Sequence, residues 1–171
     1  FSLDMLHDGD FLTPAQNYLL TNNFWQSSFM IHGGSDIFYP ILMWKILGVE
    51  TIGAARTSAY FLTLLVKFLS IILSYQITKI LSVQKETKIL FFVIFTSILI
   101  SMSQYRLITY NYYFSYRDIF IILYLIFFIE LFIDSKFKSL FIILICAIST
   151  VSILFHVDSG FYLNFILFFY S

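Results

Sequence analysis

The sequence predicts an all-α fold: a polytopic transmembrane helix bundle, residues 56–171, preceded by an extracytoplasmic loop, residues 1–55, that contains short amphipathic helices. Of the 171 residues, 60% are hydrophobic and 21% aromatic, but only 12% are charged. Soluble domains carry roughly 25% charged residues, about twice this share. The mean hydropathy of +0.87 points to the same class. A net charge of zero argues against the basic footprint of a nucleic-acid-binding protein.

Two short helices are expected in the opening loop. Thr13-Pro14 fits an N-cap followed by a proline at the first helical position, and the first helix then runs through Leu20 and ends at Asn22-Asn23. Neither this helix nor the next is long enough to cross a bilayer. Both therefore fit an interfacial position, with one face among the lipid headgroups.

The second short helix is the amphipathic segment of residues 37–47. Ser35 or Asp36 starts it, and Gly48 stops it as a C-terminal cap. Pro40 is expected in its first turn, the part of a helix that tolerates a residue without an N–H group.

Five apolar runs follow and predict five membrane-spanning helices. A span needs about 20 residues, and the second and third runs reach that length only with flanking Tyr and Ser residues. The runs are residues 59–78, within a helix that begins at Thr51, then 89–103, 119–133 and 139–155, and a fifth that starts near Phe161.

Lysines indicate which connections between these runs face the cytoplasm. The lysine-bearing connections follow the first and third runs, and they hold Lys79, Lys85 and Lys88, and then Lys136 and Lys138. Residues 104–118 and 156–160 contain no lysine. These two connections and the opening loop are therefore expected on the opposite, extracytoplasmic side.

This sorting gathers the residues with chemical potential on one side of the membrane. All three histidines of the chain belong to that side. The candidates placed there are Asp8, Asp10, His32, Asp36, Arg117, Asp118, His156 and Asp158.

Asp8 and Asp10 flank a glycine. Such a pair can bind a divalent cation, orient a phosphate through that cation, or supply one general base. The alternative is a solvated loop that turns at Gly9. A divalent cation is thus a candidate cofactor, and Asp8 and Asp10 are its candidate ligands.

His32-Gly33-Gly34 places an imidazole beside two glycines. A glycine pair lets backbone N–H groups approach an anion closely. An ordinary loop explains the same residues equally well.

Arg117-Asp118 lies at the head of the third apolar run. Asp118 there complements the positive end of a helix. Arg117, like Arg106, is placed to hold a lipid-linked phosphate. His156 and Asp158 are expected to end the fourth helix in a tight turn, and taken alone they form a polar loop.

Three further residues lie within apolar runs. Lys67 is near the middle of its helix, where it either has a buried functional role or extends its long stem to the interface. Glu130 is near a cytoplasmic end and is expected to reach water. Cys146, the only cysteine, is expected to be a small buried hydrophobic residue.

The chain begins at Phe1 without a methionine and stops at Ser171 within an apolar run. These ends predict a fragment that lacks an upstream anchor helix and further downstream helices.

The opening loop reads His7-Asp8-Gly9-Asp10, then residues 14–20, then Ile31-His32-Gly33-Gly34, then the segment ILMWKILG at 41–48. This order of features resembles the GT-C superfamily of membrane glycosyltransferases, which includes the protein mannosyltransferases and the aminoarabinose lipid A transferases. Members carry an extracytoplasmic loop with an acid pair such as Asp-Glu, then an amphipathic helix, then a polar stretch with His-Gly or a proline.

The resemblance implies transfer of a sugar from a polyprenyl-phosphate donor to a lipid, glycan or protein acceptor at the extracytoplasmic face of a bacterial inner membrane. In the family the loop acid acts as base on the acceptor or helps to bind a metal. Here His7 takes one position of the pair and Asp10 is an added acid, so Asp8 and Asp10 are both candidates for the catalytic position.

The expected geometry gives the other polar residues roles in binding substrate. Nucleotide sugars are scarce outside the cytoplasm, so a glycosyl donor there has to arrive attached to lipid. Its phosphate needs a cation at headgroup level, which Arg106 or Arg117, the neighbour of Asp118, would supply. His32 is a candidate to bind the phosphate or a metal, and His156 and Asp158 would complete the far wall.

A non-catalytic alternative is a polytopic transporter, flippase or assembly subunit. In that interpretation the opening loop serves recognition, and Lys67 marks a translocation path.

Overall fold

The computed structural model describes residues 5–24, 33–109, 114–133 and 136–170. Over these ranges the chain is all-helical, with seven helices and no strand. The helices are α1 (Met5–Thr21), α2 (Ser35–Leu47), α3 (Ile52–Ile80), α4 (Lys85–Thr109), α5 (Phe114–Ile133), α6 (Lys138–Phe155) and α7 (Val157–Tyr170).

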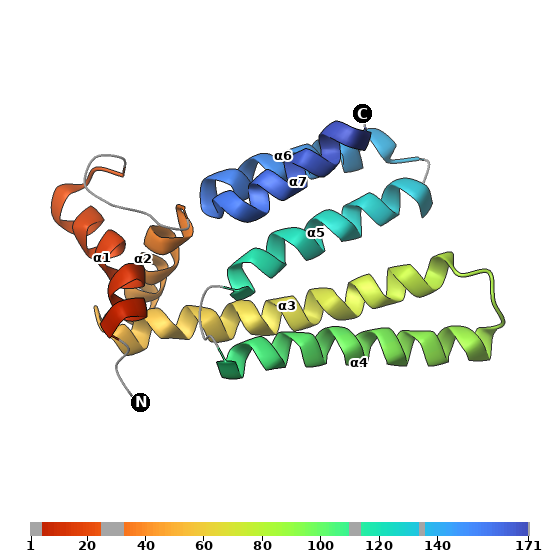
Figure 1. The fold of residues 1–171 in the computed structure, drawn as a ribbon, viewed down its shortest axis with the longest axis horizontal. Helices are drawn as coiled ribbons and strands as arrows, with labels where there is room; N and C mark the ends of the chain where they lie inside the picture. Colours follow the sequence, from red (N-terminus) through yellow and green to blue (C-terminus); the bar gives the residue numbers. More distant parts are fainter. Residues whose placement is uncertain (1–4, 25–32, 110–113, 134–135, 171) are drawn as a thin grey trace.

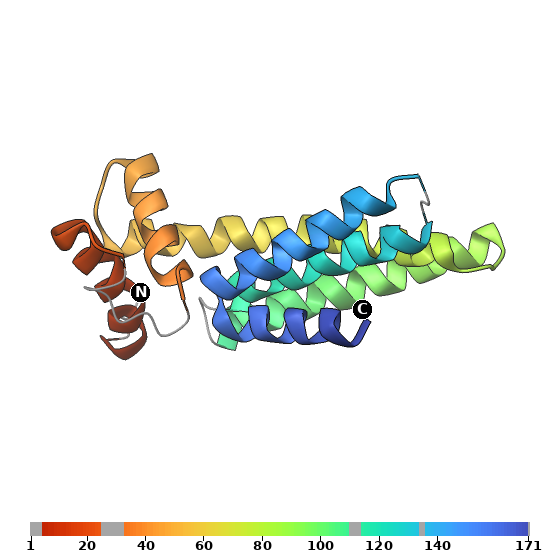
Figure 2. The same ribbon diagram turned by 90° about the horizontal axis from the view of Figure 1, so that it is seen from above.

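The long helices lie side by side, and α1 and α2 cover one end of them (Figure 1). α3 packs against both α4 and α5, α5 packs against α6, and α6 packs against α7. Seen from above, α1 and α2 stay together at that end, while α7 stops short of the far end of α3 and α4 (Figure 2). The two short helices therefore form a cap on the helical bundle rather than another layer of it.

α1 begins earlier than the sequence indicates. It starts at Met5, so Pro14 lies inside the helix and not at its first position. Pro14 is fully buried, and its neighbour Ala15 belongs to the core formed with α2 and α3. Burial here outweighs the hydrogen bond that a proline removes from a helix interior. The predicted end is confirmed, because Asn22 has a left-handed backbone (φ 54°) and its N–H group bonds the Tyr18 carbonyl.

α2 has the predicted limits. Gly48 ends it with φ 70°, and its N–H group donates to the Trp44 carbonyl at 2.8 Å. Pro40 lies in the second turn, not the first. The helix is also not amphipathic, because its outward side carries Phe38, Leu42 and Ile46. Both faces of α2 are therefore apolar.

α3 begins where a local cap predicts it. Thr51 Oγ1 accepts a hydrogen bond from the Ala54 N–H group at 3.1 Å. The indole N–H group of Trp44 donates to the Thr51 carbonyl at 2.9 Å and thereby ties the end of α2 to the start of α3. The polar cap and this hydrogen bond fix the angle at which the chain leaves the short helices.

Residues spaced three and four apart hold α3 against α5, as ridges-into-grooves packing requires. The buried side chains of this interface are Val66, Leu69 and Leu73 on α3 and Ile119, Ile122 and Ile126 on α5. Further along the same interface, Gln76 Nε2 donates to Glu130 Oε1 at 2.7 Å. Glu130, expected to reach water, is thus partly buried and paired with a neighbouring helix.

All five predicted apolar runs are helical. Among the described residues, however, only α3 and α6 are long and apolar enough to cross a membrane. The apolar parts of α5 and α7 are shorter. α4 and α5 extend into the predicted connection, to Thr109 and from Phe114. The last helix begins at Val157, four residues before the predicted Phe161.

Candidate functional site

One end of the bundle collects the predicted site. α1, α2, the C-terminal end of α4, the N-terminal end of α5 and the connection between α6 and α7 all lie there (Figure 1). The connection between α3 and α4 and the N-terminal end of α6 lie at the other end. Polar residues that are far apart in the sequence are therefore grouped by the antiparallel course of the helices.

Asp8 and Asp10 lie within α1, and the turn expected at Gly9 is absent because residues 8–10 are helical. Positions two apart in an α-helix lie on different faces. The helical backbone thus argues against a single cation held by both residues.

His32 lies outside the described residues, but the glycines after it, Gly33 and Gly34, are described and are buried. The Gly34 N–H group donates to the Leu154 carbonyl near the end of α6 at 2.7 Å. A Cβ atom on either Gly33 or Gly34 would lie 3.0 Å from that carbonyl oxygen. The glycines therefore let the two backbones approach each other, and this N–H group is not available to an anion.

This contact satisfies α6 as well. The last carbonyl groups of a helix have no partner within it. The Leu154 carbonyl accepts a hydrogen bond from the Gly34 N–H group, and the Ser152 carbonyl accepts one from the His156 N–H group at 2.7 Å. We call residues 33–39 together with residues 152–160 the docking junction.

His156 is the single residue between α6 and α7, and it is fully buried. Residues 156–160 are therefore not the predicted polar loop, since α7 starts at Val157. Asp158 is exposed in the first turn of α7, whereas Ser159 is buried. Gly160 packs directly on the backbone of Ile153, where a Cβ atom would overlap it. A wider turn is unnecessary because the two helices touch through this glycine.

Asp36 is the residue that the sequence analysis undervalued. It lies in the first turn of α2, two residues after Gly34, and its exposed fraction is 0%. It is the one buried acid among the side chains that the structure describes. The available signal was a lone carboxylate placed between a glycine pair and an apolar stretch. Ser35 beside it is also buried.

Aromatic rings seal the outer side of the docking junction. Phe155 lies edge-on to Phe38, with ring centroids 5.3 Å apart, and to Tyr39, at 6.4 Å. Burial raises the pKa of Tyr39 to about 12, because the charged phenolate is poorly solvated there. Tyr39 is therefore protonated at neutral pH and does not act as a base there.

The remaining candidates are placed by backbone alone. Arg106 lies in the last turn of α4, and Arg117 and Asp118 lie near the start of α5. All three positions belong to the end of the bundle that carries the docking junction (Figure 1).

Among the residues that the structure describes, no group of three or more His, Cys, Asp or Glu side chains is arranged to hold a metal ion. No protein-family model matches this chain, and neither the curated proteins nor the solved structures contain a match.

Proposed function

We propose that this chain belongs to a polytopic membrane glycosyltransferase. The enzyme transfers a sugar from a polyprenyl-phosphate donor to a lipid, glycan or protein acceptor at the extracytoplasmic face of a bacterial plasma membrane. Residues 1–55 lie on that face, and lipids surround the helices. The proposal extends the resemblance to the GT-C superfamily and depends on the two arguments below.

The outer surface of the helices supports a membrane location. A core helix of a soluble protein is mostly buried, whereas only 17% of the residues of α6 are buried within the protein. Large apolar side chains also face outward on α3 and α7, among them Phe61, Phe68, Phe165 and Phe168. Soluble monomers rarely expose continuous apolar surface of this kind. Contact with the hydrocarbon core of a bilayer accounts for these exposed apolar side chains.

The docking junction carries the proposal. The hydrogen bond between Gly34 and Leu154 fastens the opening segment to the end of α6, next to the buried His156, and the buried Asp36 lies at the same end of the bundle as α1. A site for a lipid-linked donor needs these parts at headgroup level: a carboxylate for the acceptor hydroxyl, and cations for the phosphate.

The roles follow from this placement. Asp8, Asp10 or Asp36 takes the proton of the acceptor hydroxyl as the new glycosidic bond forms. Arg106 or Arg117 holds the donor phosphate as it leaves, and His32 and a divalent cation are further candidates for that task. Asp118 and Asp158 line the remaining wall, and the fully buried His156 lies behind it.

The test is a transfer assay on the full-length protein in membranes, with Asp8→Asn, Asp10→Asn and Asp36→Asn made singly. We expect one of them to lose about a thousandfold in rate, or roughly 4 kcal/mol of barrier, because the acceptor loses its base. Glu86→Gln is the matched control, since Glu86 is exposed at the opposite end of the bundle. If all three variants remain within a few-fold of wild type at normal expression, the catalytic proposal fails.

Lys67 favours the second candidate, a transporter or flippase. It is half-buried near the middle of α3, the longest candidate span, and a charge at that depth often marks a translocation path. The two candidates differ in their full-length sequences. A transporter would show a repeated half with its own broken helices, whereas the enzyme would add one helix upstream and several downstream.

A further inference from the structure

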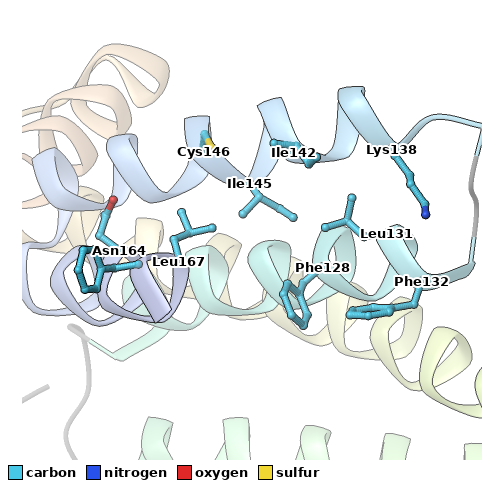
Figure 3. Close-up of a pocket in the computed structure, with 10 residues that line it drawn as sticks. Phe128, Leu131, Phe132, Lys138, Ile142, Ile145, Cys146, Asn164 and Leu167 are labelled. Atoms are coloured by element: carbon cyan, nitrogen blue, oxygen red, sulfur yellow. The ribbon is translucent and has the colours of Figure 1, made fainter. Parts of the chain in front are cut away.

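A cavity of about 670 Å³ opens between α5, α6 and α7. Phe128 and Leu131 form one wall, and Ile145 and Leu167 face them (Figure 3). This volume lies within the range of about 300–1,000 Å³ that ligand pockets occupy. The cavity is thus large enough for part of an organic ligand, and its lining selects an apolar one.

The two ends of the cavity differ in chemistry. Asn164 lies at one end and Lys138 at the other (Figure 3). The Asn164 amide group already donates to the carbonyls of Ser149, at 3.0 Å, and Gly160, at 2.8 Å. Lys138 is the one charged residue in the described lining. A ligand therefore meets a cation at one end and apolar surface along most of its length.

The start of α6 adds to the positive potential at Lys138. The helix begins at this residue, and Phe137 before it makes no side-chain cap to the first-turn N–H groups. The positive end of a helix and the N–H groups of its first turn favour a phosphate. Lys138 and the N-terminal end of α6 therefore lie at the same end of the cavity.

We propose that this cavity binds an anionic phospholipid, with an acyl chain between α5, α6 and α7 and the phosphate at Lys138. The inference depends on the membrane placement in the proposed function, but not on sugar transfer. Lys138 lies at the lysine-rich end of the bundle, which corresponds to the cytoplasmic leaflet, where anionic lipids are concentrated. The phosphate end of the site, at Lys138, thus lies at the opposite end of α6 from the docking junction.

The test uses the full chain purified in detergent and native mass spectrometry. Phosphatidylglycerol and phosphatidylcholine with identical acyl chains are titrated separately. We expect tighter binding of phosphatidylglycerol. Lys138→Ala should weaken it about fivefold, the effect of one lysine near an anionic surface, and leave phosphatidylcholine unchanged. Lys138→Gln serves if the alanine variant folds poorly. Lys85→Ala is the control, because Lys85 is exposed and does not line the cavity.

A second variant tests the apolar part of the site. Cys146, expected to be buried, is exposed and lines the cavity. Cys146→Trp should fill the space and weaken both lipids. Equal losses in Lys138→Ala and Lys85→Ala would overturn the proposal, as would no effect of Cys146→Trp. A dimer that Cys146→Trp abolishes would assign the cavity to a second copy of the chain instead. A failed transfer assay leaves all these outcomes unaffected.

Discussion

Single residues without side chains determine how closely the elements of this protein approach. Gly33 has φ 120°, a backbone region that favours glycine, and it faces the carbonyls of Leu154 and Phe155. Gly160 lets α7 lie on the backbone of α6 at Ile153. Gly9 on α1, by contrast, has open space around its Cβ position. The same residue type thus has a packing role at two places and none at a third.

Gly160→Ala should destabilise the fold strongly. The added methyl group would overlap the backbone of Ile153, which cannot move aside as a flexible side chain can. We expect a loss of roughly 3 kcal/mol or more in the free energy of unfolding, measured by thermal or denaturant unfolding in detergent. Gly9→Ala is the control and should raise stability by about 0.5–1 kcal/mol, because alanine favours a helix interior. Equal stability of both variants would show that α6 and α7 are not in contact at this glycine.

At the scale of whole helices, polar pairs add specificity to apolar interfaces. Gln76 on α3 is buried and bonds Glu130 on α5. Ser70 on α3 is also buried, but its hydroxyl group bonds the Val66 carbonyl of its own helix. The Gln76 bond therefore links two helices, whereas the Ser70 bond does not.

A double-mutant cycle tests this difference. Gln76→Leu and Glu130→Leu should show a coupling energy of about 0.6 kcal/mol and at most about 1.7 kcal/mol, the average and the maximum found for hydrogen bonds between membrane helices. The pair Ser70→Ala and Glu130→Leu should show none. Unfolding in detergent mixtures provides the four free energies for each cycle. Coupling below a few tenths of a kcal/mol for Gln76 with Glu130 would contradict the link.

The helices also show which features local sequence could predict. Gly48, Thr51 and Asn22 mark helix ends through capping chemistry that depends only on neighbouring residues, and all three predictions are confirmed. The predicted start of α1 was wrong, because Pro14 is buried in a core built from three helices. That burial is a tertiary effect. The abrupt passage from α6 to α7 depends on a close contact at Gly160, which no periodicity reveals.

The candidate site likewise has features that local sequence could predict and features that depend on distant parts of the chain. The glycine pair was recognised as a place of close backbone approach, but its partner near the end of α6 could not be inferred from spacing. Asp36 was grouped with the other polar candidates, and α2 does lie at their end of the bundle, yet the burial of Asp36 depends on elements distant in the sequence.

At the scale of the whole molecule, the two ends of the bundle should face opposite sides of a membrane. In a Cys146→Ser background, Asp158→Cys should react with an impermeant maleimide in intact cells. Lys85→Cys should react only after permeabilisation. Both positions are exposed, and they lie at opposite ends of the helices. Labelling of both from one side would contradict the proposed topology.

The hydrogen bond between Gly34 and Leu154 can form only late in synthesis of the chain. Leu154 follows Gly34 by 120 residues (154 minus 34). At a synthesis rate of about 5–20 residues per second, the ribosome needs roughly 6–24 s to supply the acceptor after it has made the donor. During that interval the Gly34 N–H group lacks the carbonyl that it bonds in the finished protein. Slowing translation would lengthen this interval without changing a single contact of the finished protein.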